Sequence, residues 1–217
     1  MNKKYIDIIY IKRGIEVELV KLYDKVMADK RFNHHGPSMM QRKEEVIWLL
    51  EVIGKSSLDE VIEFGSMAGG NLVMLSELVR DGGTVLSIEP ELEMSLKVDI
   101  VMEYIGNKCL VHHKVYTTDS NIIEILGDRP SNNLVMIDAL HETRAVLSDF
   151  DLAVKIIDRE DTWHGYIAIH DIVKPKVAVA WRKIKEIMPS TLEFICEESL
   201  RYGADSDRWG GIGIVKL

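Results

Sequence analysis

The sequence contains little cysteine, no excess of basic residues and no long uncharged apolar run. Cysteine occurs twice in 217 residues, at Cys109 and Cys196, each within a short apolar run. This usage predicts two buried, reduced thiols rather than a disulfide framework or a cysteine metal site. Asp and Glu number 35 against 27 Lys and Arg, which gives a net charge of −8. A basic surface that binds nucleic acid is therefore not expected.

The apolar segments are too short, and too often interrupted by charges, to cross a membrane. A membrane helix needs about 20 predominantly apolar residues, and no window of the sequence approaches that length. The first residues include Lys3, Lys4 and Asp7 and lack the pattern of a secretory signal peptide. These observations predict a cytoplasmic protein without a membrane partner.

Internal repeats, low-complexity tracts and linkers rich in Pro and Gly are also missing, so one folded domain is expected. Residues 4–30 carry apolar residues at helical spacing, and a second amphipathic helix follows Ser38, a candidate cap, and ends at Gly54. We interpret residues 1–55 as an N-terminal helical extension and residues 56–217 as the main domain. The Ile-rich extension packs on this domain or on a second subunit, and we favour a homodimer.

Short apolar runs with strand character alternate with helical segments through the rest of the chain. The strand-like runs are Val61–Phe64, Thr84–Ile88, Leu110–Val115, Leu134–Ile137, Tyr166–Ile169, Leu192–Ile195 and Ile212–Val215. The helical segments are Asn71–Val79, Leu92–Tyr104, Ser120–Leu126, Arg144–Ile157 and Val177–Met188. The alternation predicts an α/β fold: a doubly wound, seven-stranded, mostly parallel, Rossmann-like sheet. Because no helix separates the last two runs, we expect an antiparallel strand at the end.

A glycine-containing loop follows the first strand-like run and precedes a helix. The segment Glu63–Gly70 reads EFGSMAGG, and an acid, Glu89, ends the next strand. Glycine allows the backbone to approach a ligand closely, and ligands of open α/β sheets bind beyond the carboxyl ends of the strands. The spacing departs from the G-x-G-x-x-G pattern of dinucleotide sites. A tight strand-to-helix turn without a ligand remains the structural alternative.

The spacing of this loop resembles the S-adenosylmethionine loop of methyltransferases, which encloses the methionine part of its ligand. An acid at the position of Glu89 can accept hydrogen bonds from both ribose hydroxyls. After the third strand, Asp119 could meet the adenine amino group, with Ser120 as the cap of the next helix. A simple helix cap explains both equally well. The residues expected to bind the cofactor are Glu63, Gly65, Ser66, Gly69, Gly70, Glu89, Asp119, Ser120 and Asp138.

Four polar side chains follow the fourth and fifth strands: Asp138, His141, His170 and Asp171. Parallel strands place their carboxyl ends at one edge of a sheet, so these side chains are expected to converge on one pocket with the glycine loop.

The order of several motifs is similar to that of small class I O-methyltransferases, related to the macrocin and sugar O-methyltransferases and to cephalosporin-hydroxylase-like proteins. The motifs are Met40–Gln41, Glu44–Glu45, Trp48–Leu49, Ile137–His141, Leu147–Asp149, Trp163–Asp171 and Val179–Trp181. The resemblance implies a divalent cation, such as Mg²⁺, held by Asp138 and Asp171 with His170 as a third ligand. This sequence departs from the metal-dependent pattern, because His170 stands where an acid is often found. Hydrogen-bonding roles for these three residues are the alternative.

The chemistry implied is transfer of a methyl group to an acceptor oxygen, which must lose its proton. Either a metal lowers the pKa of the hydroxyl or a base takes the proton, with His141 as the first candidate and His170 as the second. The expected acceptor is a small hydroxylated molecule, such as a sugar or a natural product. Two other hypotheses remain: an NAD-dependent oxidoreductase, and a non-catalytic binding or scaffold protein.

Overall fold

The computed structural model describes residues 13–32, 41–90, 96–128, 132–157, 165–188, 190–196 and 210–217. The proposed cap Ser38 and the first part of the N-terminal extension lie outside these residues. Two N-terminal helices are described, α2 (Arg13–Ala28) and α3 (Lys43–Ile53). Arg42 occupies the N-cap position of α3 and makes no capping hydrogen bond with its side chain. The division at residue 55 stays a prediction.

A seven-stranded sheet has the order β3-β2-β1-β4-β5-β7-β6. The strands are β1 (Leu58–Phe64), β2 (Val79–Ile88), β3 (Cys109–His113), β4 (Asn133–Ile137), β5 (Gly165–His170), β6 (Thr191–Phe194) and β7 (Ile212–Lys216). The first five strands are parallel, whereas β7 runs antiparallel to both β5 and β6. The predicted fold class is confirmed.

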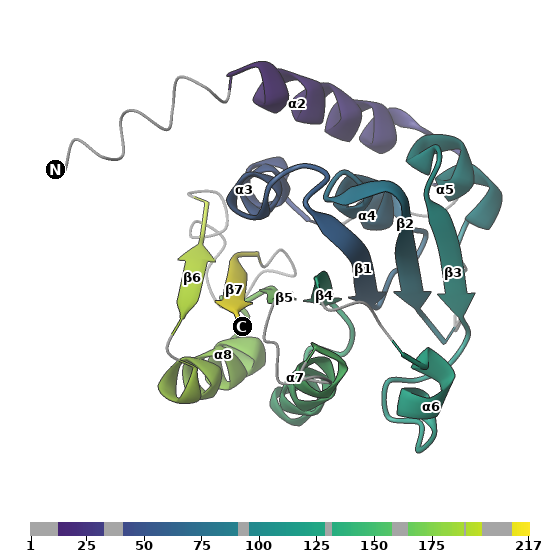
Figure 1. The fold of residues 1–217 in the computed structure, drawn as a ribbon. Coiled ribbons are helices and arrows are strands. Elements are labelled where there is room, and N and C mark those ends of the chain that lie inside the picture. Colours follow the sequence, from purple (N-terminus) through teal and green to yellow (C-terminus); the bar gives the residue numbers. More distant parts are fainter. Residues whose placement is uncertain are drawn as a thin grey trace, which may run out of the picture.

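Helices cover both faces of the sheet (Figure 1). One layer contains α2 and α3 together with α4 (Gly70–Ser76) and α5 (Val98–Ile105). The opposite layer contains α6 (Ile122–Leu126), α7 (Thr143–Ile157) and α8 (Pro175–Ile187). Residues of each central strand alternate between the two cores, as Val61 and Ile62 do, because successive strand side chains point to opposite faces. Burial on both faces explains why these strands read as continuous apolar runs.

Some boundaries differ from the expectation. The helix expected over Asn71–Val79 ends at Ser76, because Val79 already pairs with Leu58 at the start of β2. The next helix begins at Val98, and residues 91–95 of its expected range lie outside the described residues. Cys196 is buried as predicted, but Cys109 is exposed, because it opens β3 at the edge of the sheet.

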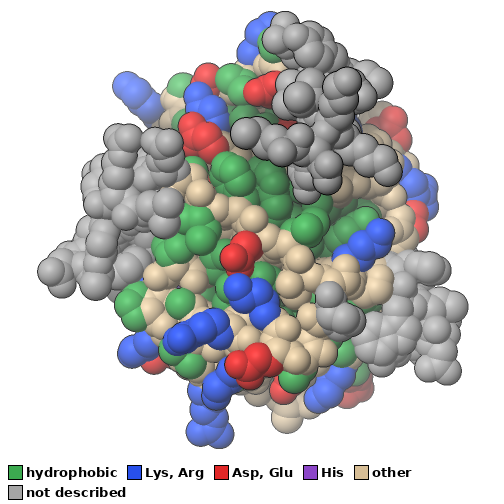
Figure 2. All heavy atoms as spheres, turned by 90° about the vertical axis from the view of Figure 1, so that its left-hand side faces the viewer, with side chains coloured by type: hydrophobic (Ala, Val, Ile, Leu, Met, Phe, Trp, Pro, Cys, Tyr) green, Lys and Arg blue, Asp and Glu red, His purple; other side chains and the backbone are tan. Residues whose placement is uncertain are grey.

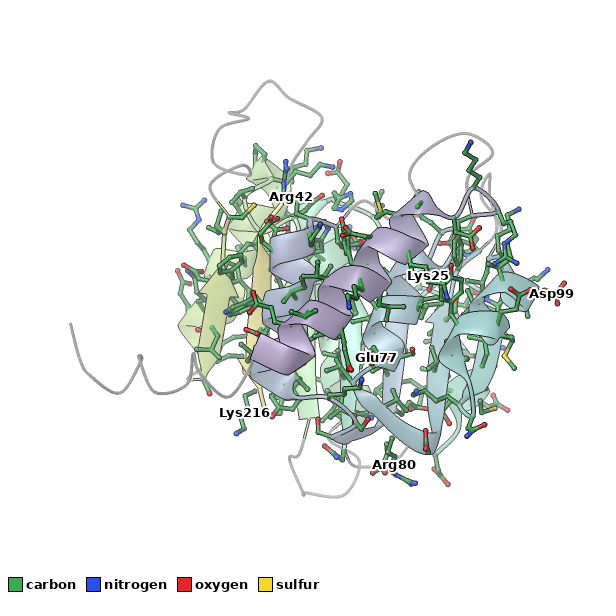
Figure 3. The ribbon with its side chains drawn as sticks, turned by 90° about the horizontal axis from the view of Figure 1, so that it is seen from above. Lys25, Arg42, Glu77, Arg80, Asp99 and Lys216 are labelled. Carbon is green, nitrogen blue, oxygen red and sulfur yellow. The ribbon has the colours of Figure 1, made fainter. Side chains whose placement is uncertain are left out.

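The register of the sheet determines where the site can form. Phe64 pairs in register with Ile88 of β2 and with Ile137 of β4. Ile137 in turn pairs in register with Ile169 of β5. The residues that follow these strands are therefore neighbours along one edge. Figure 3 shows Arg42, just before α3, on the opposite side of the molecule from Arg80 and Lys216.

The last strands form the other lateral edge of the sheet. Trp48 of α3 stacks on Phe194 of β6 with ring centroids 5.5 Å apart, and Leu192 of β6 is exposed. Figure 2 shows hydrophobic side chains gathered on this side of the molecule. None of the helices in the described part of the chain is long and apolar enough to span a membrane.

Candidate functional site

Gly65 brings the first loop against the residues that follow β4. Its backbone N–H donates to the carbonyl oxygen of Ile88 at 3.0 Å, and the N–H of Asp138 donates to the carbonyl of Phe64 at 3.0 Å. Gly65 has a φ of +87°, and a Cβ atom there would lie 2.3 Å from the carbonyl oxygen of Asp138. Only glycine fits both the conformation and the space. The backbone of the loop is therefore in direct contact with the backbone of Asp138.

Gly69 is required by packing at the other end of the loop. Its φ is +95°, and a Cβ atom would lie 2.6 Å from both Leu96 Cδ1 and Val101 Cγ2. Gly70 follows as the buried first residue of α4. Ser66 is buried as well, and its hydroxyl donates to the carbonyl oxygen of Glu63 at 3.3 Å. These contacts pack the loop against Leu96, Val101 and the end of β1.

Glu63, in β1 just before the loop, contacts the helix that follows the loop. Its side chain is completely buried, and its Oε1 accepts a hydrogen bond from Asn71 Nδ2 of α4 at 2.6 Å. Burial raises the pKa of the Glu63 carboxyl to about 8, although the hydrogen bond from Asn71 favours the ionised form. The structure thus places this predicted cofactor residue in the interior of the protein, against α4.

Glu89, which follows β2, is hydrogen-bonded to the glycine loop. The backbone N–H of Met67, within the glycine loop, donates to Glu89 Oε2 at 3.1 Å. Met67 has a φ of +45°, an unusual conformation for a residue with a side chain. The Glu89 carboxylate, which follows β2, is therefore bonded directly to the loop that follows β1.

Asp119 and Ser120, which follow β3 and were predicted to belong to the cofactor site, differ in their contacts. Asp119 Oδ2 accepts a hydrogen bond from the backbone N–H of Tyr116 at 3.1 Å, which closes the turn between β3 and α6. Ser120 is exposed, and the N-cap position of α6 is Asn121. The prediction that Ser120 caps this helix is wrong, because the extra turn at 119–121 moves the start of the helix to Ile122.

The four polar residues predicted to converge do contact one another. His141 Nε2 lies 3.3 Å from Asp138 Oδ1 and 3.1 Å from Asp171 Oδ2. His170 Nδ1 lies 3.2 Å from Asp138 Oδ1 and 3.6 Å from Asp171 Oδ1. Asp171 adopts a φ of +59° immediately after β5. We call Asp138, His141, His170 and Asp171 the carboxylate–histidine cluster.

Helix α3 adds two side chains that the sequence analysis did not assign to the site. Gln41 Nε2, just before α3, donates to Asp138 Oδ2. Glu45 is fully buried, and its Oε2 lies 3.6 Å from His170 Nε2. Its Oε1 accepts from the backbone N–H of Gly211 at 2.7 Å. The sequence contains a signal that Glu45 has a special environment. Glu45 precedes Leu49 by one helical turn, so an acid lies on the apolar face of α3.

The charges within the cluster determine its protonation. Burial alone would raise the pKa of Asp138, but the charge of His170 and the hydrogen bonds from both histidines hold it at about 2. Burial would lower the pKa of His170, and the neighbouring Asp138, Glu45 and Asp171 instead raise it well above its usual value. Burial raises the pKa of Asp171. The charges around His170 thus favour its protonated form.

The side chains as placed do not fit a divalent metal ion. Within the described ranges, no group of three or more His, Cys, Asp or Glu side chains is arranged to hold one. Asp138 Oδ1 already accepts hydrogen bonds from both histidines, and Gln41 occupies its other oxygen. Magnesium needs near-octahedral oxygen ligands at about 2.0–2.1 Å, whereas His170 offers only ring nitrogens. The metal prediction therefore gains no support from this geometry.

Comparison with known proteins identifies the family. The methyltransferase-domain family matches residues 62–172 of the chain. The match covers more than half of the 217 residues. The chain belongs to this family. The matched segment runs from β1 to the residues that follow β5, so it includes the glycine loop, Glu89 and the whole carboxylate–histidine cluster. No curated protein sequence gives a significant match.

Solved methyltransferase structures share the fold of this family member. The O-methyltransferase TomG from Streptomyces achromogenes, in complex with S-adenosylmethionine, has 11% identity and a TM-score of 0.58 over 94% of this chain and 96% of that one. An O-methyltransferase from Bacillus cereus, in complex with S-adenosylhomocysteine, has 15% identity and a TM-score of 0.52 over 92% and 91%. An S-adenosylmethionine-dependent O-methyltransferase from Thermotoga maritima has 14% identity and a TM-score of 0.60 over 90% and 71%.

Proposed function

We propose that this methyltransferase-family protein transfers a methyl group from S-adenosylmethionine to a hydroxyl oxygen of a small acceptor, with His141 as the general base. The observation that carries the proposal is the position of His141 Nε2, 3.3 Å from Asp138 and 3.1 Å from Asp171. This arrangement lies directly beside the glycine loop, because the backbones of Gly65 and Asp138 are in contact.

The residues present fit S-adenosylmethionine. The loop from Gly65 to Gly69 packs so closely on the protein that a Cβ atom at either glycine would collide with it, and the loop lies at the carboxyl end of β1, where open α/β sheets bind ligands. Glu89 is partly exposed and hydrogen-bonded to the loop, and in this proposal its carboxylate accepts hydrogen bonds from the two ribose hydroxyls. When bound, S-adenosylmethionine supplies a methyl group on a sulfonium sulfur, so that a carbon–oxygen bond forms as the carbon–sulfur bond breaks, leaving S-adenosylhomocysteine.

The contacts of His141 select the tautomer that a base needs. Its Nε2 faces two carboxylates, so Nε2 carries the hydrogen and donates it, which leaves Nδ1 as the nitrogen that can take a proton. The side chain is 30% exposed, enough to be reached by an acceptor. Asp138 and Asp171 also stabilise the imidazolium that forms when His141 takes the acceptor proton, as a carboxylate does behind a catalytic histidine in hydrolases.

Two observations support oxygen as the atom that is methylated. A neutral hydroxyl must lose a proton during transfer, and the site holds a histidine oriented for that task. The similar structures from Streptomyces achromogenes and Bacillus cereus are themselves described as O-methyltransferases. We propose a small hydroxylated molecule as the acceptor, in agreement with the sequence analysis.

Calorimetric titration with S-adenosylhomocysteine tests the proposal, once with Mg²⁺ and once with a chelator, and with NAD as the control ligand. Saturable binding of S-adenosylhomocysteine and none of NAD is the expected result. Binding of NAD instead would replace the proposal with an oxidoreductase. Binding of S-adenosylhomocysteine without transfer to any member of a hydroxylated acceptor panel would favour a non-catalytic binding protein.

A further inference from the structure

Strand β6 lies at one lateral edge of the sheet, and among the described strands it pairs only with β7. Leu192 pairs in register with Ile214, and Phe194 with Ile212. Both isoleucines belong to the core on the α3 side of the sheet, and cross-strand partners point to the same face. Leu192 therefore faces the α3 side, yet it is 53% exposed. The described residues leave this end of the layer uncovered.

Helix α3 extends the uncovered apolar surface. Trp48 stacks on Phe194 with ring centroids 5.5 Å apart, so this face of α3 is turned toward β6. Val52 follows Trp48 by one helical turn on the same face, and both side chains are only partly buried. We call Trp48, Val52, Leu192 and Phe194 the β6-edge patch. Figure 2 views the molecule from this side and shows hydrophobic side chains gathered there.

The course of α2 brings the N-terminal residues close to this patch. Tyr104 of α5 donates to Asp29, which directly follows α2, at 2.9 Å, so α2 ends on the β3 side of the sheet. Near its start, Glu18 lies 3.6 Å from Lys55, two residues after α3. The helix therefore begins at the end of α3 that carries Val52. Figures 1 and 3 both show the start of α2 on the side of the molecule that carries β6 and β7.

The chain before α2 has the composition of a segment that needs burial. Residues 1–12 lie outside the described residues, and six of the seven residues from Tyr5 to Ile11 are isoleucine or tyrosine. Lys4 and Lys12 flank this stretch. An extended chain covers about 3.3 Å per residue, so seven residues span roughly 23 Å, about twice the width of one helix. This length is enough to cross α3 and reach β6.

We propose that residues 5–11 dock on the β6-edge patch of their own chain and cover it. Burial of apolar surface on both partners drives the docking. The tether to α2 favours this occupant over a second copy of the chain, because a linked segment is present at high effective concentration. The docked segment holds α3 against the edge of the sheet. Through Glu45, whose Oε2 lies 3.6 Å from His170 Nε2, this helix also contacts the carboxylate–histidine cluster.

A nitroxide spin label on the segment tests the proposal in the full chain, without cofactor or acceptor. Cys109 is exposed and is first replaced by Cys109→Ser, whereas Cys196 is buried and stays. Lys4→Cys then carries the label, and ¹³C-methyl leucine reports on the patch through Leu192, whose signal is identified by its loss in Leu192→Met. Leu110 of β3, at the opposite edge of the sheet, is the control.

We expect the label to broaden the methyl signals of Leu192 strongly and to leave those of Leu110 unchanged. A mixture of spin-labelled chains and separate isotope-labelled chains distinguishes the two possible occupants. Leu192 should remain sharp in this mixture, because the contact lies within one chain. Broadening in the mixture as well would assign the patch to a second copy and overturn the proposal. A sharp Leu192 signal in both samples would also overturn it.

A charge placed in the segment provides the second test. Ile9→Asp should release the segment, so that backbone amide hydrogens of β6 exchange about tenfold faster or more, as expected for loss of one buried isoleucine. Val98→Asp is the matched control, because Val98 is a 40% exposed apolar residue on α5. Equal exchange of β6 in the unchanged protein and in Ile9→Asp would contradict docking. Failure of S-adenosylhomocysteine binding would remove the proposed function and leave both results as measured.

Discussion

A Cβ atom on Gly65 would lie 2.3 Å from the carbonyl oxygen of Asp138, so the glycine loop and the carboxylate–histidine cluster are in direct backbone contact. The contact joins the part of the site assigned to the cofactor with the part assigned to proton transfer. An atom added at Gly65 must push the two apart.

Gly65→Ala should therefore damage both stability and binding. A left-handed backbone costs a residue with a side chain roughly 1–2 kcal/mol, and the collision adds about 1–3 kcal/mol of overpacking. Gly82→Ala is the matched control, because Gly82 also has a positive φ, +74°, but no atom lies within 4 Å of its Cβ position. Denaturant unfolding and S-adenosylhomocysteine titration should show loss of binding in Gly65→Ala alone. Equal effects in both variants would contradict the contact.

Glu89→Gln should weaken S-adenosylhomocysteine binding without destabilising the protein. A hydrogen bond to a charged acceptor is worth about 1.5–3 kcal/mol, so we expect affinity to fall by roughly ten- to a hundredfold. Glu186→Gln, on the exposed side of α8, is the control for a general loss of negative charge. Calorimetry measures both. Unchanged affinity in Glu89→Gln would remove this residue from the cofactor site.

His141→Ala should slow methyl transfer about 10²–10⁴-fold and leave the affinity for S-adenosylhomocysteine intact, because the base contacts the acceptor rather than the cofactor. Transfer of labelled methyl to a panel of small hydroxylated acceptors measures the rate. Glu142→Gln is the neighbouring control, since Glu142 is exposed and pairs with Lys176 outside the cluster. A turnover in His141→Ala equal to that of the unchanged protein would exclude His141 as the base.

Glu63→Gln should change how stability depends on pH. The pKa of the Glu63 carboxyl is about 8 in the folded protein, against an ordinary value of 4.5. The folded state therefore binds more protons than the unfolded state between these values, and the contribution of Glu63 to stability is present below pH 4.5 and lost as pH rises through about 8. The slope amounts to about 1.4 kcal/mol per pH unit for one group.

Glutamine cannot ionise, so the Glu63→Gln variant does not lose this stability as pH rises. The unfolding free energy of the variant relative to that of the unchanged protein should therefore increase between pH 4.5 and about 8. Urea unfolding at several pH values measures the difference. Asn71 Nδ2 donates to Glu63 Oε1 at 2.6 Å, and the introduced amide must orient its carbonyl oxygen toward that donor. A constant difference between pH 5 and 8 would show that Glu63 is already ionised in the folded state.

Several features were predictable because they depend on local pattern. Apolar runs of strand length alternate with helical segments, and this alternation alone predicted the parallel sheet that β1 to β5 form. Asp138 and Asp171 were expected to meet because each follows a strand that ends at the same edge, and both contact His141. Ser120 was misassigned because a cap residue is distinguished from its neighbours only by the turn geometry around it.

The fold class, the position of the glycine loop and the set of polar residues at the strand ends could be predicted from the sequence, because they follow from hydrophobic periodicity and from the direction of parallel strands. The contacts among those residues depend on how distant segments pack in three dimensions. Glu45 lies 166 residues from Gly211, whose N–H it accepts, and Gln41 lies 97 residues from Asp138. The docking of α3 on the edge of the sheet places a third carboxylate, that of Glu45, against His170, and no local pattern encodes this long-range contact.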